Sequence, residues 1–163
     1  MPTPRRGRAQ IHIAAPPLRV YELVTDVTRM GEWSPECYWC EWLDAATTAS
    51  VGARFRGYNR RGRYRWERTA IVQTADAGHE FAFVTVNDRT GRHETHWQYT
   101  MEPSRMGTLL TEQFEFVWCS ITNRAVEMFL PRGRQVQHGV EETLTRIKRA
   151  AEGITKGGWV RAD

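Results

Sequence analysis

The sequence has few cysteines and no long apolar run, and each absence excludes a class of protein. Its three cysteines are too few, and odd in number, for a disulfide framework. No uncharged apolar run approaches the roughly 18 residues that a membrane-spanning helix needs, so we expect no membrane insertion. The first residues are basic but lack the apolar region of a signal peptide. These features predict a protein of the reducing cytoplasm.

Several catalytic motifs are also missing. The chain contains no GxSxG elbow, phosphate-binding loop, HExxH helix or dinucleotide fingerprint, so we expect no cofactor. His93-x-x-His96 and Cys37-x-x-Cys40 have the residue types of a zinc site. However, roughly fifty residues separate the two pairs, and His93 and His96 on one strand would point to opposite faces. We therefore predict no metal site.

What is present is the composition of one globular domain. Of 163 residues, 40% are hydrophobic and 26% are charged. We predict a single domain at residues 9–152, with flexible ends at 1–8 and 153–163, that exists as a monomer or a homodimer. Seven tryptophans, six phenylalanines and five tyrosines indicate a large core or an aromatic-lined cavity. The net charge of +4 predicts only weak attraction to acidic partners.

The spacing of apolar residues predicts an α+β order of elements. A strand at 10–14 precedes short helices at 18–27 and 27–33, and six strand patterns follow at 38–44, 52–60, 63–75, 79–87, 92–102 and 107–118. Mostly hairpin-short gaps predict an antiparallel sheet. A short helix at 122–130 and a long amphipathic helix at Gln135–Glu152 complete the order. A curved seven-stranded sheet wrapped around the long helix buries both apolar faces and leaves a cavity between them.

Four segments carry a family resemblance. They are IHIAAPP at 11–17, LVTDVTRMGEWSPEC at 23–37, EFAF at 80–83 and TLTRIK at 143–148. The chain resembles the START-like helix-grip (SRPBCC) superfamily over roughly residues 9–152, and within it the actinobacterial polyketide cyclase/dehydrase-type proteins. The resemblance implies a helix-grip fold with a deep apolar cavity for a lipid-like or polycyclic ligand. It implies a particular reaction far less strongly, because this fold hosts carriers, sensors and enzymes.

Strand alternation predicts which side chains face this cavity. Where one face of a strand is charged, the other face is assigned inward. The predicted cavity residues are Phe55, Asn59, Trp66, Phe81, Phe83, Trp97, Tyr99, Leu110, Phe114 and Val140. A bulge would shift any of these assignments by one residue.

Three residues of the inferred inner face are the candidate catalytic groups: Arg68, Glu112 and Tyr64. Because a buried charge is costly unless paired, either Arg68 and Glu112 satisfy each other or they line a wet, ligand-binding region. In the functional interpretation Arg68 stabilises an enolate, Glu112 moves a proton and Tyr64 donates a hydrogen bond to a ligand carbonyl. In the structural interpretation the charges form a pair, or a bulge places one of them outside, and the tyrosine is a core ring.

The function expected from these residues is binding of a small hydrophobic, polyketide- or lipid-like molecule. Cyclase or dehydratase (lyase) activity is one alternative, and a non-catalytic carrier or sensor is the other. A third alternative comes from residues 54–68, where seven arginines are interleaved with four aromatic residues. This pattern alone resembles a nucleic-acid platform, but alternation puts most of the arginines on the solvent face. Nucleic acid is therefore not the expected partner, and a module for another acidic partner remains the third alternative.

The stretch WSPECYWCEW at residues 33–42 holds two cysteines with redox or metal-motif spacing. Such a motif needs a helix N-terminus or a tight knuckle to bring both sulfurs together. Here a helix is predicted to end before Cys37, and a strand is predicted to contain Cys40. Extended geometry would point the two thiols apart, so we predict that both serve packing.

Overall fold

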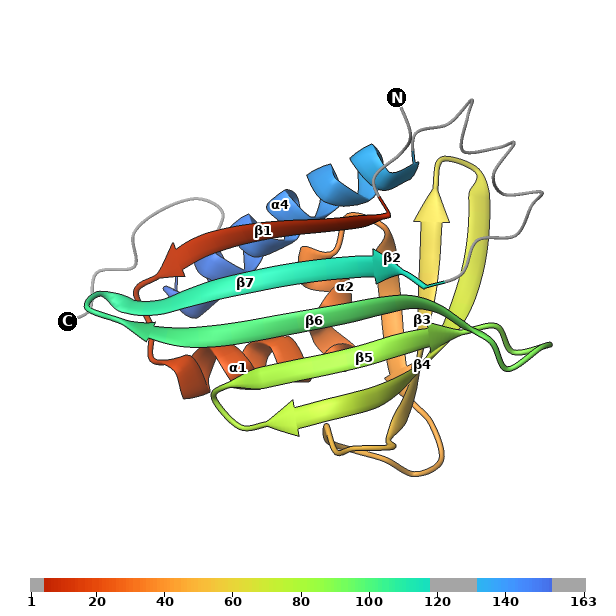
Figure 1. Cartoon of the computed structure of the whole chain (residues 1–163), viewed down its shortest axis with the longest axis horizontal. Coiled ribbons are helices and arrows are strands. Elements are labelled where there is room, and N and C mark those ends of the chain that lie inside the picture. The colour runs from red at the N-terminus through yellow and green to blue at the C-terminus, as the bar shows by residue number, and fades with distance from the viewer. Residues whose placement is uncertain (1–4, 118–131, 154–163) are drawn as a thin grey trace.

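The computed structural model describes residues 5–117 and 132–153. Its elements follow the predicted order (Figure 1). They are β1 (Arg6–Ile13), α1 (Pro17–Thr25), a 3-10 turn (Val27–Arg29), α2 (Met30–Trp33), β2 (Cys37–Trp42), β3 (Arg54–Arg61), β4 (Tyr64–Asp76), β5 (Glu80–Val86), β6 (His93–Ser104), β7 (Gly107–Phe116) and α4 (Arg132–Ala151). The helix predicted at 122–130 lies outside the described residues, as do residues 1–4 and 154–163 of the two predicted flexible ends, whereas residues 6–8 belong to β1.

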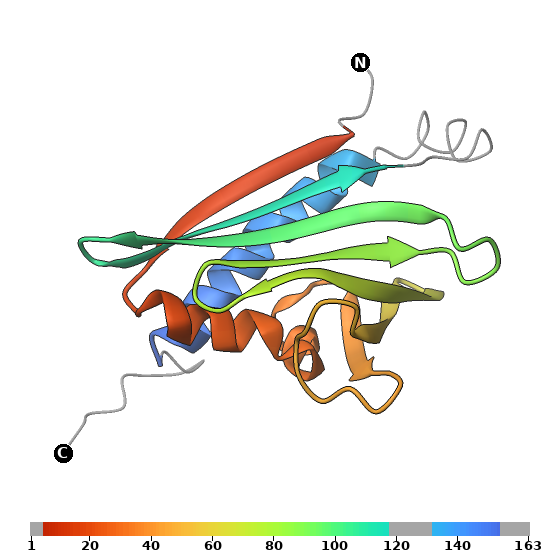
Figure 2. The same cartoon turned by 60° about the horizontal axis from the view of Figure 1, so that its bottom comes forward.

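All seven strands form one antiparallel sheet in the order β1-β7-β6-β5-β4-β3-β2. The sheet is strongly curved, and α4 lies across its concave side behind β1 and β7 (Figures 1 and 2). The two short helices connect β1 at one edge to β2 at the opposite edge. The α+β helix-grip fold with its seven-stranded sheet is therefore confirmed.

Helix α1 begins where the sequence places its proline pair. Pro16 precedes the helix in an extended conformation, and Pro17 occupies the first turn, where a missing N–H matters least. The helix then buries Val20, Leu23 and Val24 against the core. This face anchors the connection that crosses from β1 toward the cavity.

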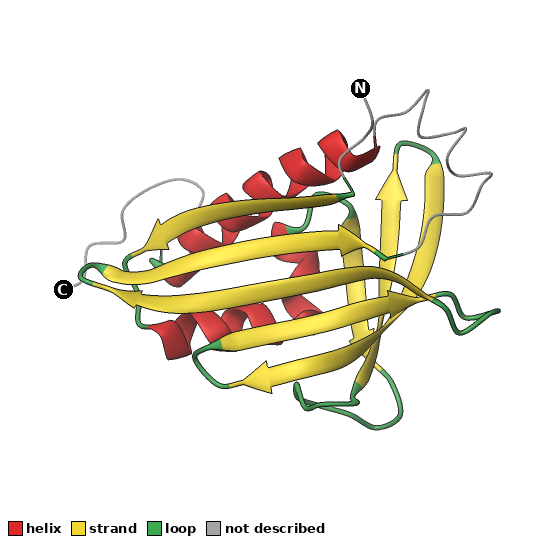
Figure 3. Cartoon of the chain, viewed as in Figure 1, coloured by secondary structure: helices red, strands yellow, loops and turns green. Residues whose placement is uncertain are grey.

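Helix α4 has one apolar stripe and one polar flank, and both have a structural use. Val136, Val140, Leu144 and Ile147 are buried toward the sheet. On the flank, Gln137 exchanges two hydrogen bonds with the backbone of Arg8 on β1, at 3.1 and 3.0 Å. These bonds occupy backbone groups on the edge strand that would otherwise be open to pairing with another chain. The helix therefore covers both the exposed edge of β1 and the concave face of the sheet (Figure 3).

Candidate functional site: a cavity between the sheet and α4

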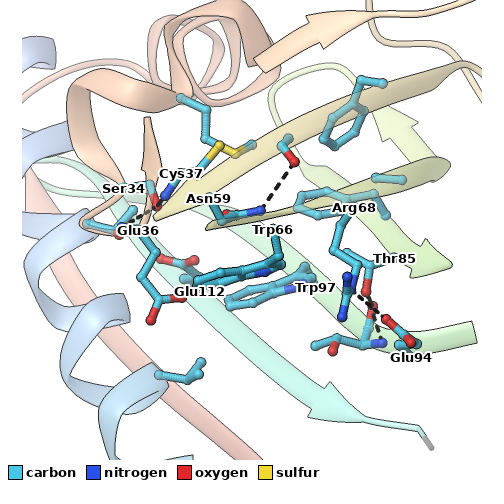
Figure 4. Close-up of a pocket in the computed structure, with 18 of the residues that line it drawn as sticks. Ser34, Glu36, Cys37, Asn59, Trp66, Arg68, Thr85, Glu94, Trp97 and Glu112 are labelled. Atoms are coloured by element: carbon cyan, nitrogen blue, oxygen red, sulfur yellow. Dashed lines mark hydrogen bonds and ion pairs between the residues drawn. The ribbon is translucent and has the colours of Figure 1, made fainter. Parts of the chain in front are cut away.

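A cavity of about 500 Å³ lies between the concave face of the sheet and the N-terminal part of α4. Strands β3 to β7 form most of its wall, and the junction from α2 to β2 closes one side. Figure 4 shows Trp66, Trp97, Arg68 and Glu112 in this pocket. The volume falls in the range that holds drug-sized ligands.

The ten residues that strand alternation assigned to the cavity lie in three places in the structure. Six predicted residues line the cavity: Phe55, Asn59, Trp66, Phe83, Trp97 and Tyr99. Three others, Phe81, Leu110 and Phe114, belong to the buried core. Val140 is buried on α4 and lines a second pocket of about 400 Å³, between the start of α4 and the tip of the β3–β4 hairpin. Contacts of the aromatic rings along the wall, such as Phe55 with Phe83 at 5.0 Å between ring centres, hold its shape.

Glu112 is a buried carboxyl group of this wall. Its side chain is 2% exposed, and it lines both pockets. The Tyr99 hydroxyl donates a hydrogen bond of 2.7 Å to Glu112 Oε1, while Oε2 has no partner among the described residues. Burial raises the pKa of Glu112 from 4.5 to about 8, and the bond from Tyr99 offsets part of that rise. The group is therefore mostly a neutral carboxylic acid at neutral pH and can donate a proton.

The hydroxyl of Tyr99 is held in its protonated form by the same surroundings. Burial is the main cause that raises the pKa of Tyr99 well above 10, followed by the charge of Glu112 and the hydrogen bond to it. Tyr99 and Glu112 are cross-strand partners on β6 and β7, so the sheet register itself brings them together. A tyrosine and a carboxyl group thus share one wall of an apolar cavity.

Of the alternatives for Arg68 and Glu112, the structure excludes a mutual ion pair. Arg68 forms an ion pair of 2.7 Å with Glu94, and its side chain is 43% exposed. Arg68 and Glu112 lie on β4 and β7, three strand spacings apart, which is about 14 Å along a sheet. Unbroken alternation along β6 from Trp97 would turn Glu94 outward, but the register shifts between Thr85 and Val86 on β5, and Glu94 lines the cavity.

Tyr64 is also not a core ring. It is 69% exposed, stacks on Trp66 with 5.3 Å between ring centres, and borders the cavity. Arg68 and Tyr64 therefore belong to the rim of the cavity, where they can contact a ligand on its way in. The position of Glu112 on the inner face agrees with the alternation along β7.

A second ion pair at the rim joins elements that sequence reasoning did not connect. Arg132, the first residue of α4, forms a bidentate ion pair with Glu36 in the α2–β2 junction, with Nη2 of Arg132 2.7 Å from Oε2 of Glu36. The same guanidinium lies 5.6 Å from the centre of the Trp66 ring. Both Arg132 and Glu36 line the cavity. No periodicity or motif in the sequence pointed to this contact, because its partners are far apart in the chain.

The two cysteines of the β2 strand share one face, which corrects the predicted divergence. A register shift between Cys37 and Trp39 adds a residue to the strand, so that Tyr38 and Trp39 are both exposed while Cys37 and Cys40 are both buried. Both thiols are free. Cys37 lines the cavity, so packing alone does not describe its position.

The arginines of the β3–β4 hairpin have mostly local partners. Arg54 pairs with Asp44 at 3.2 Å and Arg56 with Glu67 at 3.7 Å. Arg60 and Arg65 both lie over the ring of Tyr38, at 5.5 and 5.8 Å. These contacts explain the four arginines as parts of the outer face of the hairpin, without a bound ligand.

Two kinds of feature are absent from the described residues. Across 5–117 and 132–153, no three His, Cys, Asp or Glu side chains are grouped so as to hold a metal ion. Within the same ranges, no helix has the length and apolar character needed to cross a bilayer.

Comparison with known proteins identifies the family. The family model described as "Polyketide cyclase / dehydrase and lipid transport" matches residues 13–138. The Polyketide_cyc-like protein Cgl2372 from Corynebacterium glutamicum is 34% identical, with a TM-score of 0.63 over 92% of this chain and 93% of that one. Protein CV1439 from Chromobacterium violaceum shares the fold at 17% identity, with a TM-score of 0.68 over 91% of this chain and 99% of that one.

A third solved structure is DynU16, a protein of the dynemicin biosynthetic locus. It shares the fold at 16% identity with a TM-score of 0.60, and the match covers 90% of this chain but 46% of DynU16. No curated protein matches the sequence. The family match spans most of the chain, and the cavity between sheet and helix fits a hydrophobic-ligand-binding fold. The chain belongs to the polyketide cyclase/dehydrase and lipid transport family, within the START-like SRPBCC superfamily.

Proposed function

We propose that the protein binds a small hydrophobic, carbonyl-bearing molecule of polyketide- or lipid-like character and catalyses its cyclisation or dehydration. The observation that carries the proposal is Glu112, a fully buried carboxyl group with an unpartnered oxygen on the wall of an aromatic-lined cavity. A buried acceptor or donor without a partner is costly, and a bound ligand can supply the missing partner. The neutral acid can donate to a carbonyl or hydroxyl oxygen of that ligand.

The chemistry of a dehydration fits one acid of this kind. Protonated Glu112 gives its proton to a departing hydroxyl group, which leaves as water. The resulting carboxylate then takes a proton from the carbon next to the ligand carbonyl, which restores the acid and leaves a carbon–carbon double bond. Because the pKa of Glu112 is about 8, both forms are accessible near neutral pH. The hydrogen bond from Tyr99 keeps the carboxyl group oriented for both transfers.

The aromatic wall supplies the remaining part of the mechanism. Trp97, Phe83 and Phe55 hold a flexible apolar molecule in a folded shape and exclude water from its reactive carbons. At the rim, Arg68 and Tyr64 contact polar groups of the ligand. No cofactor takes part in these steps. A cytoplasmic location and a monomeric or homodimeric state stay predictions.

The second candidate function is a non-catalytic carrier or sensor for the same class of molecule. The description of the family includes lipid transport, and the observation that favours this alternative is the position of Arg68. Arg68 pairs with Glu94 at the rim and not with Glu112, so it does not take the enolate-stabilising position beside Glu112 that the catalytic interpretation gave it. Both functions use the same cavity, so turnover separates them.

The test is turnover of aromatic β-hydroxy ketones and linear polyketones, followed by loss of water in the product mass. Glu112→Gln keeps the shape of the side chain but cannot transfer the proton, and we expect turnover to fall by about 100-fold or more while binding persists. Glu115→Gln is the matched control, because Glu115 lies on the same strand but is exposed. If Glu112→Gln and Arg68→Ala both turn over ligand at the wild-type rate, the catalytic assignment fails. If the wild type binds these ligands without converting them, the protein is a carrier or sensor.

A further inference from the structure

One nucleophilic group of the cavity has no role in the mechanism above. Cys37 is 5% exposed and lines the same cavity as Tyr99 and Glu112. It reaches this position because the bulge in β2 turns both thiols of the strand toward the interior. Its sulfur lies against the space above Gly57, where an added Cβ would come within 3.4 Å of it. Figure 4 shows Cys37 beside Ser34, Glu36 and Asn59 in the pocket wall.

The neighbours of Cys37 favour its ionised form. A hydrogen bond from the Cys40 thiol is the largest cause that lowers the pKa of Cys37, and backbone groups of Trp39 and Tyr58 act in the same direction. Burial opposes this effect. The pKa of Cys40 is raised by the same hydrogen bond and by burial, so Cys40 stays a neutral donor. When Cys37 is protonated, its thiol donates to the carbonyl oxygen of Trp39 at 3.2 Å.

The thiol also lines the same cavity as Tyr99 and Glu112. Burial and Glu112 are the main causes of the raised pKa of Tyr99, and a charge on Cys37 acts in the same direction as the smallest of them. Tyr99 in turn donates to Glu112, whose second oxygen has no partner in the described part of the chain. A nucleophile and a proton donor therefore face one apolar space.

We propose that Cys37 forms a covalent adduct with ligands that contain an α,β-unsaturated carbonyl group, with the carbonyl oxygen bound at Tyr99 and Glu112. This proposal rests on the proposed function, because the cavity must first bind a carbonyl-bearing apolar ligand. Such enones are also the products of the dehydration described above. The thiol would thus capture a product, or an electrophilic ligand of the same class, inside the cavity.

The addition balances without an oxidant or a further reactant. The Cys37 thiol loses its proton to water, and the sulfur then forms a bond to the β-carbon of the enone. The π electrons move to the carbonyl oxygen, which takes a proton from Glu112. The enol then returns that proton to the Glu112 carboxylate while the α-carbon gains a proton from water, so that S–H has added across the double bond and Glu112 is again the acid. Cys40 is a positioning residue, since it acts on Cys37 and not on the ligand.

The test uses trans-chalcone as an apolar aromatic enone and dihydrochalcone as its saturated analogue. Cys119 lies outside the described residues, so the reference protein carries Cys119→Ser. Intact-mass spectrometry should show one added chalcone on the reference protein, and peptide mapping should place it on Cys37. In Cys37→Ser the rate of addition should fall at least about tenfold. Cys37→Ala serves as a second variant in case the serine variant does not fold.

Two substitutions of Cys40 test whether its hydrogen bond to Cys37, and not only its packing, affects the rate of addition. Cys40→Ala removes the hydrogen-bond donor and should slow addition by about threefold or more, whereas Cys40→Ser keeps a donor and should restore the rate. Dihydrochalcone should bind all of these variants and compete with chalcone.

The outcomes separate this proposal from the one on which it rests. If dihydrochalcone binds but chalcone forms no adduct, or forms one equally in Cys37→Ser, the covalent proposal is overturned and the binding function stands. An adduct that appears on the wild type but not on the Cys119→Ser protein places the reactive thiol at Cys119 and also overturns it. If neither compound binds or reacts, both proposals fail for this ligand class.

Discussion

Tyr99 on β6 donates a 2.7 Å hydrogen bond to Glu112 on β7, and the two are direct cross-strand partners inside the cavity. The bond stabilises the carboxylate form, while the complete burial of Glu112 stabilises the acid form. Burial is the larger effect, so the pair remains protonated where an exposed glutamate would be ionised. The pKa of Glu112 therefore differs between the folded and the unfolded chain, and this difference makes the stability of the fold depend on pH.

The first prediction concerns stability as a function of pH. The pKa of Glu112 is 4.5 in its ordinary state and about 8 in the fold. Between these values the folded state holds a proton that the unfolded state has released, so the free energy of unfolding falls as pH rises. The slope from this group is at most about 1.4 kcal/mol per pH unit. The contribution of Glu112 to the free energy of unfolding is complete below pH 4.5 and is lost as the pH rises through about 8.

Urea unfolding at about pH 5 and about pH 8 measures this slope. Glu112→Gln does not titrate, so its stability should fall less between the two conditions than that of the wild type. Glu115→Gln is exposed on the same strand and should keep the wild-type slope. Parallel pH profiles for the wild type and Glu112→Gln would show that Glu112 ionises as freely in the fold as outside it.

The second prediction is that Tyr99→Phe raises the pKa of Glu112 further above about 8. The hydroxyl of Tyr99 is the group that lowers this pKa, and phenylalanine removes it while keeping the ring. Carboxyl ¹³C NMR of Glu112 through a pH titration reports the shift directly. Tyr58→Phe is the matched control, because the Tyr58 hydroxyl donates to Glu41 and not to Glu112. A downward shift, or an equal shift in both variants, would contradict the assigned role of Tyr99.

The sequence predicts the position of Glu112 but not its partners, and the difference has a physical origin. Alternation runs unbroken along β7, so the inward face follows from counting. The partner of Arg68 depends instead on a register shift at the β5–β6 pair, which brings Glu94 into the wall. Bulges are set by packing across neighbouring strands, which a single strand pattern does not contain. The same limit explains the wrong expectation for Cys37 and Cys40.

Contacts between segments that are far apart in the chain are the second kind of feature that the sequence pattern does not predict. The order of elements follows from local spacing and turn residues, and it was confirmed. The rim contact of Arg132 with Glu36 depends on how the start of α4 meets the α2–β2 junction. That meeting is a property of the folded chain, and nothing in the local sequence around either residue encodes it.

The third prediction tests the turn between β6 and β7. Gly107 has φ +132°, and a Cβ there would lie 2.3 Å from the carbonyl oxygen of Ile13 and 2.7 Å from the backbone nitrogen of Ala15. Gly107→Ala must push the end of β1 away from the turn, and we expect a loss of about 2–4 kcal/mol in urea unfolding. Gly91→Ala is the control, since Gly91 also has positive φ (+67°) but open space around it, and should cost about 1 kcal/mol. Equal losses in the two variants would mean that backbone strain alone, and not the contact with β1, decides the effect.

The rim pair of Arg132 and Glu36 leads to a prediction about ligand entry. The pair ties the start of α4 to the α2–β2 junction, and the guanidinium also covers the face of Trp66. Two cavity-lining elements are therefore connected by one side chain at the opening. Such a partly exposed pair contributes about 1 kcal/mol or less to stability, so its removal changes access to the cavity more than it changes the fold.

Arg132→Met keeps much of the side-chain volume but removes the charge, and we expect it to speed both binding and release of the neutral dye Nile red. The increase should reach up to about fivefold, the equivalent of the roughly 1 kcal/mol that such a pair contributes. Stopped-flow fluorescence measures both rates, and urea unfolding should change by less than about 1 kcal/mol. Arg134→Met makes the same chemical change at an exposed position on the same helix and should leave both rates unchanged. Equal rates in the wild type and Arg132→Met would mean that the rim pair does not control entry. A rise in both variants would assign the effect to net charge, since the cavity would then respond to any arginine lost from α4.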